Sequence, residues 1–140
     1  MTGNIWNLGD ILDVVGDHLG EDSPALIHGD RKTSWPKMTA RSNNVARALR
    51  DRGVESGDKA GFYLRNQPEY TEALVACFKA RLVHVNVNYR YLEDELAYIF
   101  DNSDSAVVFY DVEFRANIER IRDRLSGVKV WVEIGGDGDT

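Results

Sequence analysis

Residues 106–110 read AVVFY, and Asp111 follows them directly. An unbroken apolar run of this length, with no alternating polar residue, is typical of a strand that is covered on both faces, as strands of parallel sheets are. Beyond it, apolar residues recur at helical intervals, at Phe114, Ile118, Ile121 and Leu125. A buried strand that leads into an amphipathic helix predicts one half of a βαβ unit.

The same alternation extends to both sides of this stretch. Short apolar runs predict further strands over 60–64, 82–87 and 128–134. We expect one intervening helix to begin at Asn66, as an N-cap before Pro68, and another at the acidic residues 93–95. The inward stripe of that second helix is predicted to consist of Leu92, Leu96, Ile99 and Phe100. The fold class is therefore α/β, a mostly parallel sheet of βαβ units with flanking helices and right-handed crossovers.

The first 53 residues follow another pattern. A helix over about 8–19 is predicted, with Asn7 as its cap and Gly20 at its end, and 25–27 with 32–34 predict a short antiparallel hairpin around Gly29-Asp30. Ser34 caps the next predicted helix, which holds Pro36 in its first turn and ends at Gly53. Its inward stripe is Met38, Ser42, Val45, Ala46 and Leu49, and its arginines, interpreted as a solvated basic face, are Arg41, Arg47, Arg50 and Arg52.

Composition limits the classes of function. The chain has 140 residues, 23 acidic and 17 basic, and a formal net charge of −6, which disfavours general binding of nucleic acid. No apolar run approaches the ~18 residues of a transmembrane segment. Cys77 is the only cysteine, and residues 1–6 resemble no signal peptide, so we expect a reducing, cytoplasmic location. The length predicts one domain over 1–140, with a flexible polar end at 135–140.

Motifs that carry chemistry are absent. The sequence contains no P-loop, no Gly-x-Gly-x-x-Gly, no His-Glu-x-x-His, no Cys-x-x-Cys and no Gly-x-Ser-x-Gly. The histidines His18, His28 and His84 lie far apart, and Cys77 falls on an apolar helix face, as an inert core thiol does. Asp111 has the position of a receiver-type phosphoacceptor, but the acidic pair that holds Mg²⁺ in such domains is replaced by 64–67, LRNQ. We therefore assign no catalytic, cofactor-binding or metal-binding residue.

One loop is unusual in composition. Residues 86–91 read NVNYRY, where a predicted parallel strand ends. Ligands of open α/β sheets gather at such ends, which favours a binding role. Asparagines that satisfy local backbone groups in a rigid loop are the structural alternative.

At this loop the chain resembles the N-terminal region of the adenylate-forming acyl-CoA synthetases, the fatty-acid–CoA ligases. The resemblance covers about residues 8–134. It rests on TSW (33–35), NVARAL (44–49), GVESGDK (53–59), LRNQPEY (64–70), ACFKA (76–80), VNVNYRY (85–91) and DEL (94–96). The sequence departs from the family pattern at Arg81, where glycine is frequent, and at Leu92, where a capping threonine is common.

The resemblance implies a two-step ligase. A carboxylate attacks the α-phosphate of ATP, releasing pyrophosphate, and the CoA thiol then displaces AMP. It implies ATP, Mg²⁺ and CoA for the full-length enzyme, a fatty-acid substrate, and functional residues downstream of Thr140. This chain would then be an inactive structural fragment with no cofactor bound, and it would partner the remainder of the enzyme. The roles left to it are those of a scaffold, of one wall of the acyl pocket, or of a contact in a homo-oligomer. The alternative is a free-standing small α/β regulatory or oligomerisation module.

Overall fold

The computed structural model of the chain describes residues 6–136. The expectations for residues 1–5 and 137–140, including most of the flexible end, lie outside this range. The helices are α1 (Leu8–His18), α2 (Trp35–Asp51), α3 (Pro68–Lys79), α4 (Glu93–Asn102) and α5 (Arg115–Ile121), with 3-10 turns at Val112–Phe114 and Arg122–Arg124. The strands are β1 (Pro24–His28), β2 (Arg31–Ser34), β3 (Lys59–Tyr63), β4 (Val83–Asn86), β5 (Ser105–Asp111) and β6 (Val130–Ile134).

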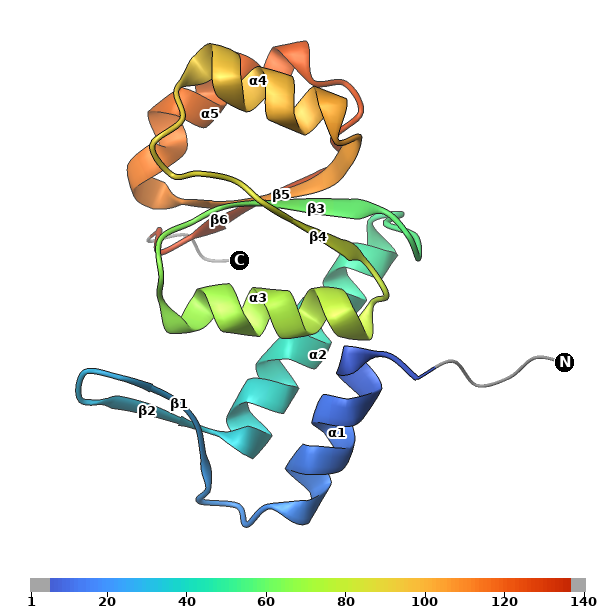
Figure 1. Cartoon of the computed structure of the whole chain (residues 1–140), viewed down its shortest axis with the longest axis vertical. Helices are drawn as coiled ribbons and strands as arrows, with labels where there is room; N and C mark the ends of the chain where they lie inside the picture. The colour runs from blue at the N-terminus through green and yellow to red at the C-terminus, as the bar shows by residue number, and fades with distance from the viewer. Residues whose placement is uncertain (1–5, 137–140) are drawn as a thin grey trace, which may run out of the picture.

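The predicted fold class is confirmed. Four parallel strands form one sheet in the order β4-β3-β5-β6, and β1 with β2 forms a separate antiparallel hairpin. Helices α4 and α5 cover one face of the sheet, and α2 and α3 lie on the other (Figure 1). All seven residues of β5 are buried, as the AVVFY run predicts.

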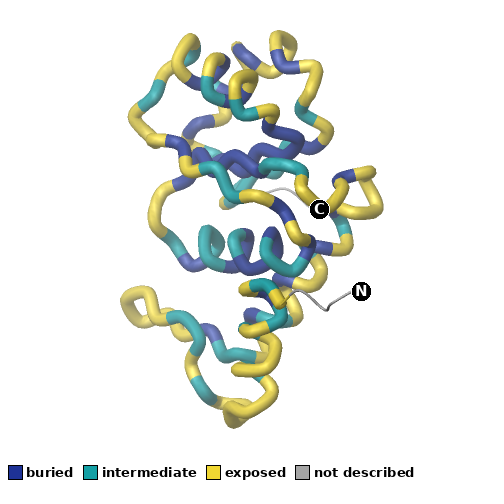
Figure 2. The backbone as a smooth tube through the Cα atoms, turned by 45° about the vertical axis from the view of Figure 1, so that its right-hand side comes forward, coloured by how far each residue is buried: buried dark blue, intermediate teal, exposed yellow. Residues whose placement is uncertain are grey.

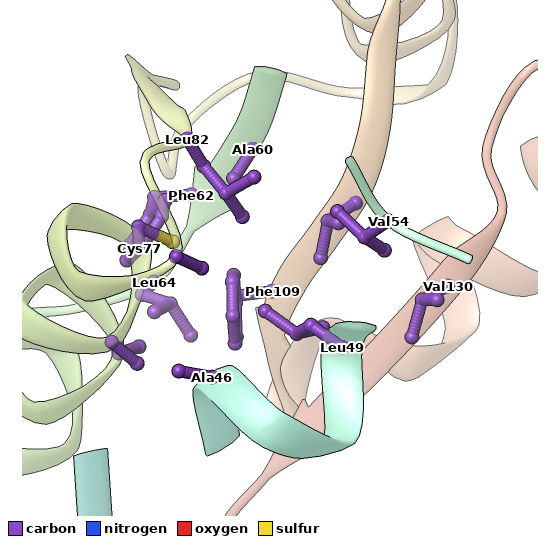
Figure 3. Close-up of a cluster of buried hydrophobic side chains, with 14 residues drawn as sticks. Ala46, Leu49, Val54, Ala60, Phe62, Leu64, Cys77, Leu82, Phe109 and Val130 are labelled. Carbon is purple, nitrogen blue, oxygen red and sulfur yellow. The ribbon is translucent and has the colours of Figure 1, made fainter. Parts of the chain in front are cut away.

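Each face of the sheet has its own hydrophobic cluster. Towards α2 and α3, Phe62 and Phe109 pack with ring centroids 4.8 Å apart, and Leu49 and Cys77 close the cluster from the helices (Figure 3). Towards α4 and α5, the cluster contains Tyr63, Leu96, Phe100, Val108, Ile118 and Ile121. The stripe predicted from Phe114 to Leu125 is buried at all four positions, although its helix is shorter than expected and ends at Ile121.

Helix α1 is attached to the end of α3 rather than to the sheet (Figure 1). Asn7 caps it as predicted, since its Oδ1 accepts the amide of Asp10 at 3.0 Å, and its Nδ2 donates to the Phe78 carbonyl at 3.1 Å. A Cβ on Gly9 would come within 2.8 Å of the Lys79 backbone nitrogen, so only glycine allows this approach. The Lys79 ammonium lies 2.6 Å from the Asp13 carboxylate.

Of three predictions at helix ends, two are wrong and one is confirmed. Gln67, not Asn66, is the N-cap of α3, and its side chain makes no capping bond because Asp111 accepts it instead. Gly20 directly follows the C-cap Leu19, which is the position predicted for it at the end of α1. Leu92 does not join the inward stripe of α4, because it is the N-cap residue and lies 64% exposed.

The arginines of α2 are not a uniform solvated face. The Arg41 Nε lies 2.7 Å from an oxygen of Glu72, a carboxylate that is 4% exposed. Sequence reasoning missed this pair, although Glu72, which directly precedes the apolar run 73–78 of α3, was its signal. Arg81, the departure from the family pattern, adopts φ 60°, the left-handed conformation that favours glycine. Its guanidinium lies 3.2 Å from Asp10, so the arginine that replaces glycine also ties α1 to this turn.

No helix in residues 6–136 is both long and apolar enough to cross a bilayer.

Candidate functional site

The strand order locates the place where a ligand crevice would form. If the four parallel strands are numbered 1 to 4 in chain order, starting with β3, the spatial order β4-β3-β5-β6 reads 2-1-3-4. This is the flavodoxin-like arrangement. The order reverses between β3 and β5, and ligands of such sheets bind beyond the carboxyl ends of the two strands at this switch point. The relevant segments are 64–67, which follows β3, and 111–113, which is the last residue of β5 with the turn after it.

Asp111 lies at the centre of the switch point and is 7% exposed. One carboxylate oxygen accepts the Arg65 amide at 2.7 Å, and the other accepts the side-chain amide of Gln67. Both oxygens are therefore engaged by the loop that follows the neighbouring strand. The carboxylate joins the two loops, and this arrangement does not favour the receiver-type role considered for Asp111.

Arg65 covers the same edge from outside. Its guanidinium forms a two-point ion pair with Glu113 and lies 4.7 Å from the centroid of the Tyr89 ring. The hydrogen bond to Glu113 raises the pKa of Arg65. Phe114 lies on another side of the guanidinium, with its ring centroid 5.6 Å away. Charge and aromatic surface are thus paired within the chain, and the polar groups of the switch point are bonded to one another.

The loop 86–91 is held by local hydrogen bonds. Asn88 Oδ1 accepts the amide of Arg90 at 3.0 Å, and the Asn88 carbonyl accepts the amide of Tyr91 at 3.0 Å. The Tyr63 hydroxyl donates to the Tyr91 carbonyl at 2.8 Å and accepts from Asn117 at 3.1 Å. These contacts favour the structural interpretation of the loop over the ligand-binding one.

The histidines do not converge. His18 ends α1, His28 ends β1, and His84 lies on β4 at the edge of the sheet. His84 Nε2 is 2.9 Å from the Tyr70 hydroxyl, and its ring packs on Phe62 with centroids 4.6 Å apart. Burial lowers the pKa of His84. Across residues 6–136, no three His, Cys, Asp or Glu side chains gather as a metal site would require.

Cys77 has the environment predicted for a core thiol. It is fully buried in the cluster between α3 and the sheet (Figure 3). Burial raises the pKa of the Cys77 thiol to about 12. The thiolate, which is the reactive form, is therefore scarce at neutral pH.

A hollow beside the start of α3 lacks the features of a phosphate site. Its volume is about 280 Å³, and the β1–β2 hairpin faces the first turn of α3 across it. Phosphate sites at helix starts need free amides and a glycine-rich approach. Here Pro68 removes one amide, the loop 64–67 has no glycine, and the side chain of Gln67 is bonded to Asp111. These residues do not fit a nucleoside triphosphate or its Mg²⁺.

Comparison with known proteins decides the family. A family model described as "AMP-binding enzyme" matches residues 17–138. The chain belongs to this family. The 3-oxocholest-4-en-26-oate–CoA ligase of Rhodococcus rhodochrous is 39% identical over 135 residues, which are 95% of this chain and 24% of that ligase. A medium/long-chain-fatty-acid–CoA/3-oxocholest-4-en-26-oate–CoA ligase of Mycobacterium marinum is 34% identical with the same coverage.

Solved structures of CoA ligases share the fold of this AMP-binding chain. A putative long-chain-fatty-acid CoA ligase of Rhodopseudomonas palustris superposes with a TM-score of 0.86 at 26% identity, covering 98% of this chain and 34% of the other. An anthranilate CoA ligase solved in complex with anthranoyl-AMP gives 0.85 at 27% identity, covering 94% of this chain and 25% of the other. The resemblance to the N-terminal region of acyl-CoA synthetases is confirmed, and the chain spans about a quarter of the curated ligases it matches.

Proposed function

We propose that this chain is the N-terminal scaffold of an ATP-dependent ligase that joins an apolar carboxylic acid to CoA, and that it supplies none of the reacting groups itself. The observation that carries the proposal is that the polar groups at the switch point are bonded to one another. Asp111 is bonded to Arg65 and Gln67 at the edge where ligands of such sheets bind, so both of its carboxylate oxygens are already engaged. The ligases it resembles are about four times longer, which leaves room for the chemistry elsewhere.

The substrate proposal is a carboxylic acid on a large apolar body. The names of the relatives cover a fatty acid and 3-oxocholest-4-en-26-oate, which is a steroid acid. Both classes pair one carboxylate with an extended hydrocarbon surface. ATP, Mg²⁺ and CoA belong to the complete ligase in this proposal, and residues 6–136 are not assigned to bind them.

The remaining parts of the proposal concern context. We place the ligase in the cytoplasm, because the single cysteine suits a reducing compartment. Residues 1–140 would act as one domain and partner the remainder of the enzyme, and association of two copies would be a property of the assembled ligase.

Two assays test this function. The purified chain, mixed with ATP, Mg²⁺ and a long-chain fatty acid, should release no pyrophosphate above a protein-free blank. A chimera in which the chain replaces the matching region of the Rhodococcus rhodochrous ligase should release pyrophosphate with 3-oxocholest-4-en-26-oate. Turnover by the isolated chain, or a folded but inactive chimera, would contradict the proposal.

A further inference from the structure

Helix α1 is attached to the rest of the chain with little apolar contact. None of its residues belongs to either hydrophobic cluster of the sheet. Of its 11 residues, all of which the structure describes, only Gly9 is buried, and the apolar side chains of Leu8, Ile11 and Val15 are exposed. Burial of apolar surface, which holds most amphipathic helices in place, therefore contributes little to the docking of α1.

Two ion pairs hold α1 against the C-terminal end of α3. The Lys79 ammonium lies 2.6 Å from Asp13, and the Arg81 guanidinium lies 3.2 Å from Asp10. Lys79 also donates to Asn43 of α2 at 2.8 Å, which fixes its position between the two helices. We call the pairs Asp13–Lys79 and Asp10–Arg81 the α1 latch. Both acids belong to α1 and both bases to residues 79–81, so these opposite charges meet only when the helix is docked.

The two pairs of the α1 latch differ in their contact with solvent. The side chain of Lys79 is 8% exposed and that of its partner Asp13 is 50% exposed. In the other pair, both side chains are open to water, with Arg81 44% and Asp10 40% exposed. Salt screens exposed charges strongly and buried charges much less. The Asp10–Arg81 pair is therefore the more salt-sensitive half of the latch.

A released α1 does not remain a helix. Isolated helices shorter than about 12–15 residues are marginal in water, and α1 has 11 residues. Two of them are glycines, Gly9 and Gly16, which lower the helix propensity further. Because neither hydrophobic cluster contains a residue of α1, unfolding of this segment leaves the sheet intact, as a local opening does.

We propose that α1 is a detachable helix and that the α1 latch controls its docking in response to ionic strength. In the docked state, the helix presents Leu8, Ile11 and Val15 as one apolar face at a fixed place on the chain. In the released state, the segment is unfolded and this face no longer exists. The inference goes beyond the proposed function and does not depend on it, because it concerns only contacts within residues 6–136.

Hydrogen exchange of the unaltered chain tests the proposal at about 20 mM and about 500 mM KCl, where the Debye length is roughly 20 Å and roughly 4 Å. After correction for intrinsic exchange rates, the α1 amides should exchange about 3–10 times faster at the higher salt concentration, because both ion pairs are weakened. The amides of α4 are the internal control. They should change less than about twofold, because buried Leu96 and Phe100 hold α4 in place.

The substitution Arg81→Gly separates the latch from the general stability of the chain. Arg81 has φ 60°, a conformation that favours glycine, so the change relieves backbone strain while it removes the partner of Asp10. The midpoint of urea unfolding should stay the same or rise, while the α1 amides should exchange at least about threefold faster. A merely structural role of Arg81 would move stability and α1 protection in the same direction.

A matched pair of lysine substitutions tests the other half of the latch. Lys79→Met keeps most of the apolar stem but removes the ammonium beside Asp13, and it should speed α1 exchange about tenfold. Lys129→Met removes an ion pair of similar length, 2.9 Å to Asp58, that does not involve α1. This control should leave α1 exchange unchanged within about twofold.

Four results would overturn the proposal. They are equal α1 exchange at the two salt concentrations, α1 amides without protection at low salt, α1 and α4 amides that speed up together, and unchanged α1 exchange in Arg81→Gly. The third would show that α1 opens only with the whole fold. Where Lys79→Met fails to fold, the salt comparison and Arg81→Gly still decide, because neither removes a buried charge.

Discussion

Helices α1 and α5 carry the same kind of apolar stripe, but only one of the two stripes is covered. In and after α5, Ile118 and Ile121 are fully buried and Leu125 is 6% exposed. On α1, the residues at equivalent spacing remain open, with Leu8 54%, Ile11 47% and Val15 39% exposed. Figure 2 shows the contrast, since dark blue dominates the central sheet while the part of the chain with α1 and the β1–β2 hairpin is mostly yellow and teal. Periodicity therefore specifies which face of a helix is apolar, while the neighbouring elements decide whether that face contributes to stability.

The largest effect is predicted when isoleucine is replaced by alanine at a covered position, and it should be absent at an exposed one. Ile118→Ala should cost about 2–5 kcal/mol, because the deleted atoms leave a cavity in a closed cluster. Ile11→Ala should change the free energy of unfolding by less than about 0.5 kcal/mol, because that side chain is half in water. Urea unfolding followed by circular dichroism measures both. Equal losses would show that the α1 stripe is covered in solution.

Alanine in place of glycine should act on the whole chain at one position and on α1 alone at another. A Cβ on Gly61 would lie 2.7 Å from a ring carbon of Phe100, so Gly61→Ala should destabilise the whole chain by about 1–3 kcal/mol. Gly9→Ala should instead push α1 away from the backbone of α3 and leave the sheet intact. Hydrogen exchange would then show faster exchange of α1 amides only. A global loss of protection in the Gly9 variant would mean that α1 is an integral part of the core.

A substitution of Asp111 at the switch point should have a smaller effect on the free energy of unfolding. Asp111→Asn keeps the shape but replaces one accepting oxygen with a donor, facing either the Arg65 amide or the Gln67 amide. We expect a loss of about 1–3 kcal/mol, measured by thermal or urea unfolding. Glu113→Gln is the control, since it weakens an exposed ion pair, which is typically worth about 0–1 kcal/mol. An Asp111→Asn variant as stable as the unaltered chain would contradict the prediction that this carboxylate holds the two loops together.

The smallest effect concerns pH and the β4 edge. Burial lowers the pKa of His84, so the folded chain favours the neutral ring and the unfolded chain binds more protons. This contribution to stability is fully present above the unfolded pKa of about 6.5 and is lost as pH falls through the lowered folded pKa. Unfolding midpoints of the unaltered chain and His84→Gln, compared between about pH 5 and 8, should converge at the acidic end. Parallel curves would contradict the prediction.

Much of the fold could be predicted from local chemistry. The AVVFY run, the caps Asn7 and Ser34, and the stripe from Phe114 all act within a few residues of themselves, and the structure places them as expected. The errors arose where distant groups competed for the same atoms. Gln67 could not be recognised as a cap because its side chain is bonded to Asp111, 44 positions away in sequence. Arg41 was interpreted as solvated because nothing nearby shows that Glu72 is buried against it.

The candidate site follows the same division. The residue types at strand ends, with no glycine-rich loop among them, predict a chain without its own catalytic centre, and this stays a prediction. By itself, the sequence determined the alternation of strands and helices, the apolar faces and the family resemblance, because these depend on spacing along the chain. Only the tertiary structure decided that the switch point is closed by Asp111, Arg65 and Gln67 and that β6 is an open edge. Strand order and long-range hydrogen bonds depend on which distant segments meet, and no local pattern encodes that choice.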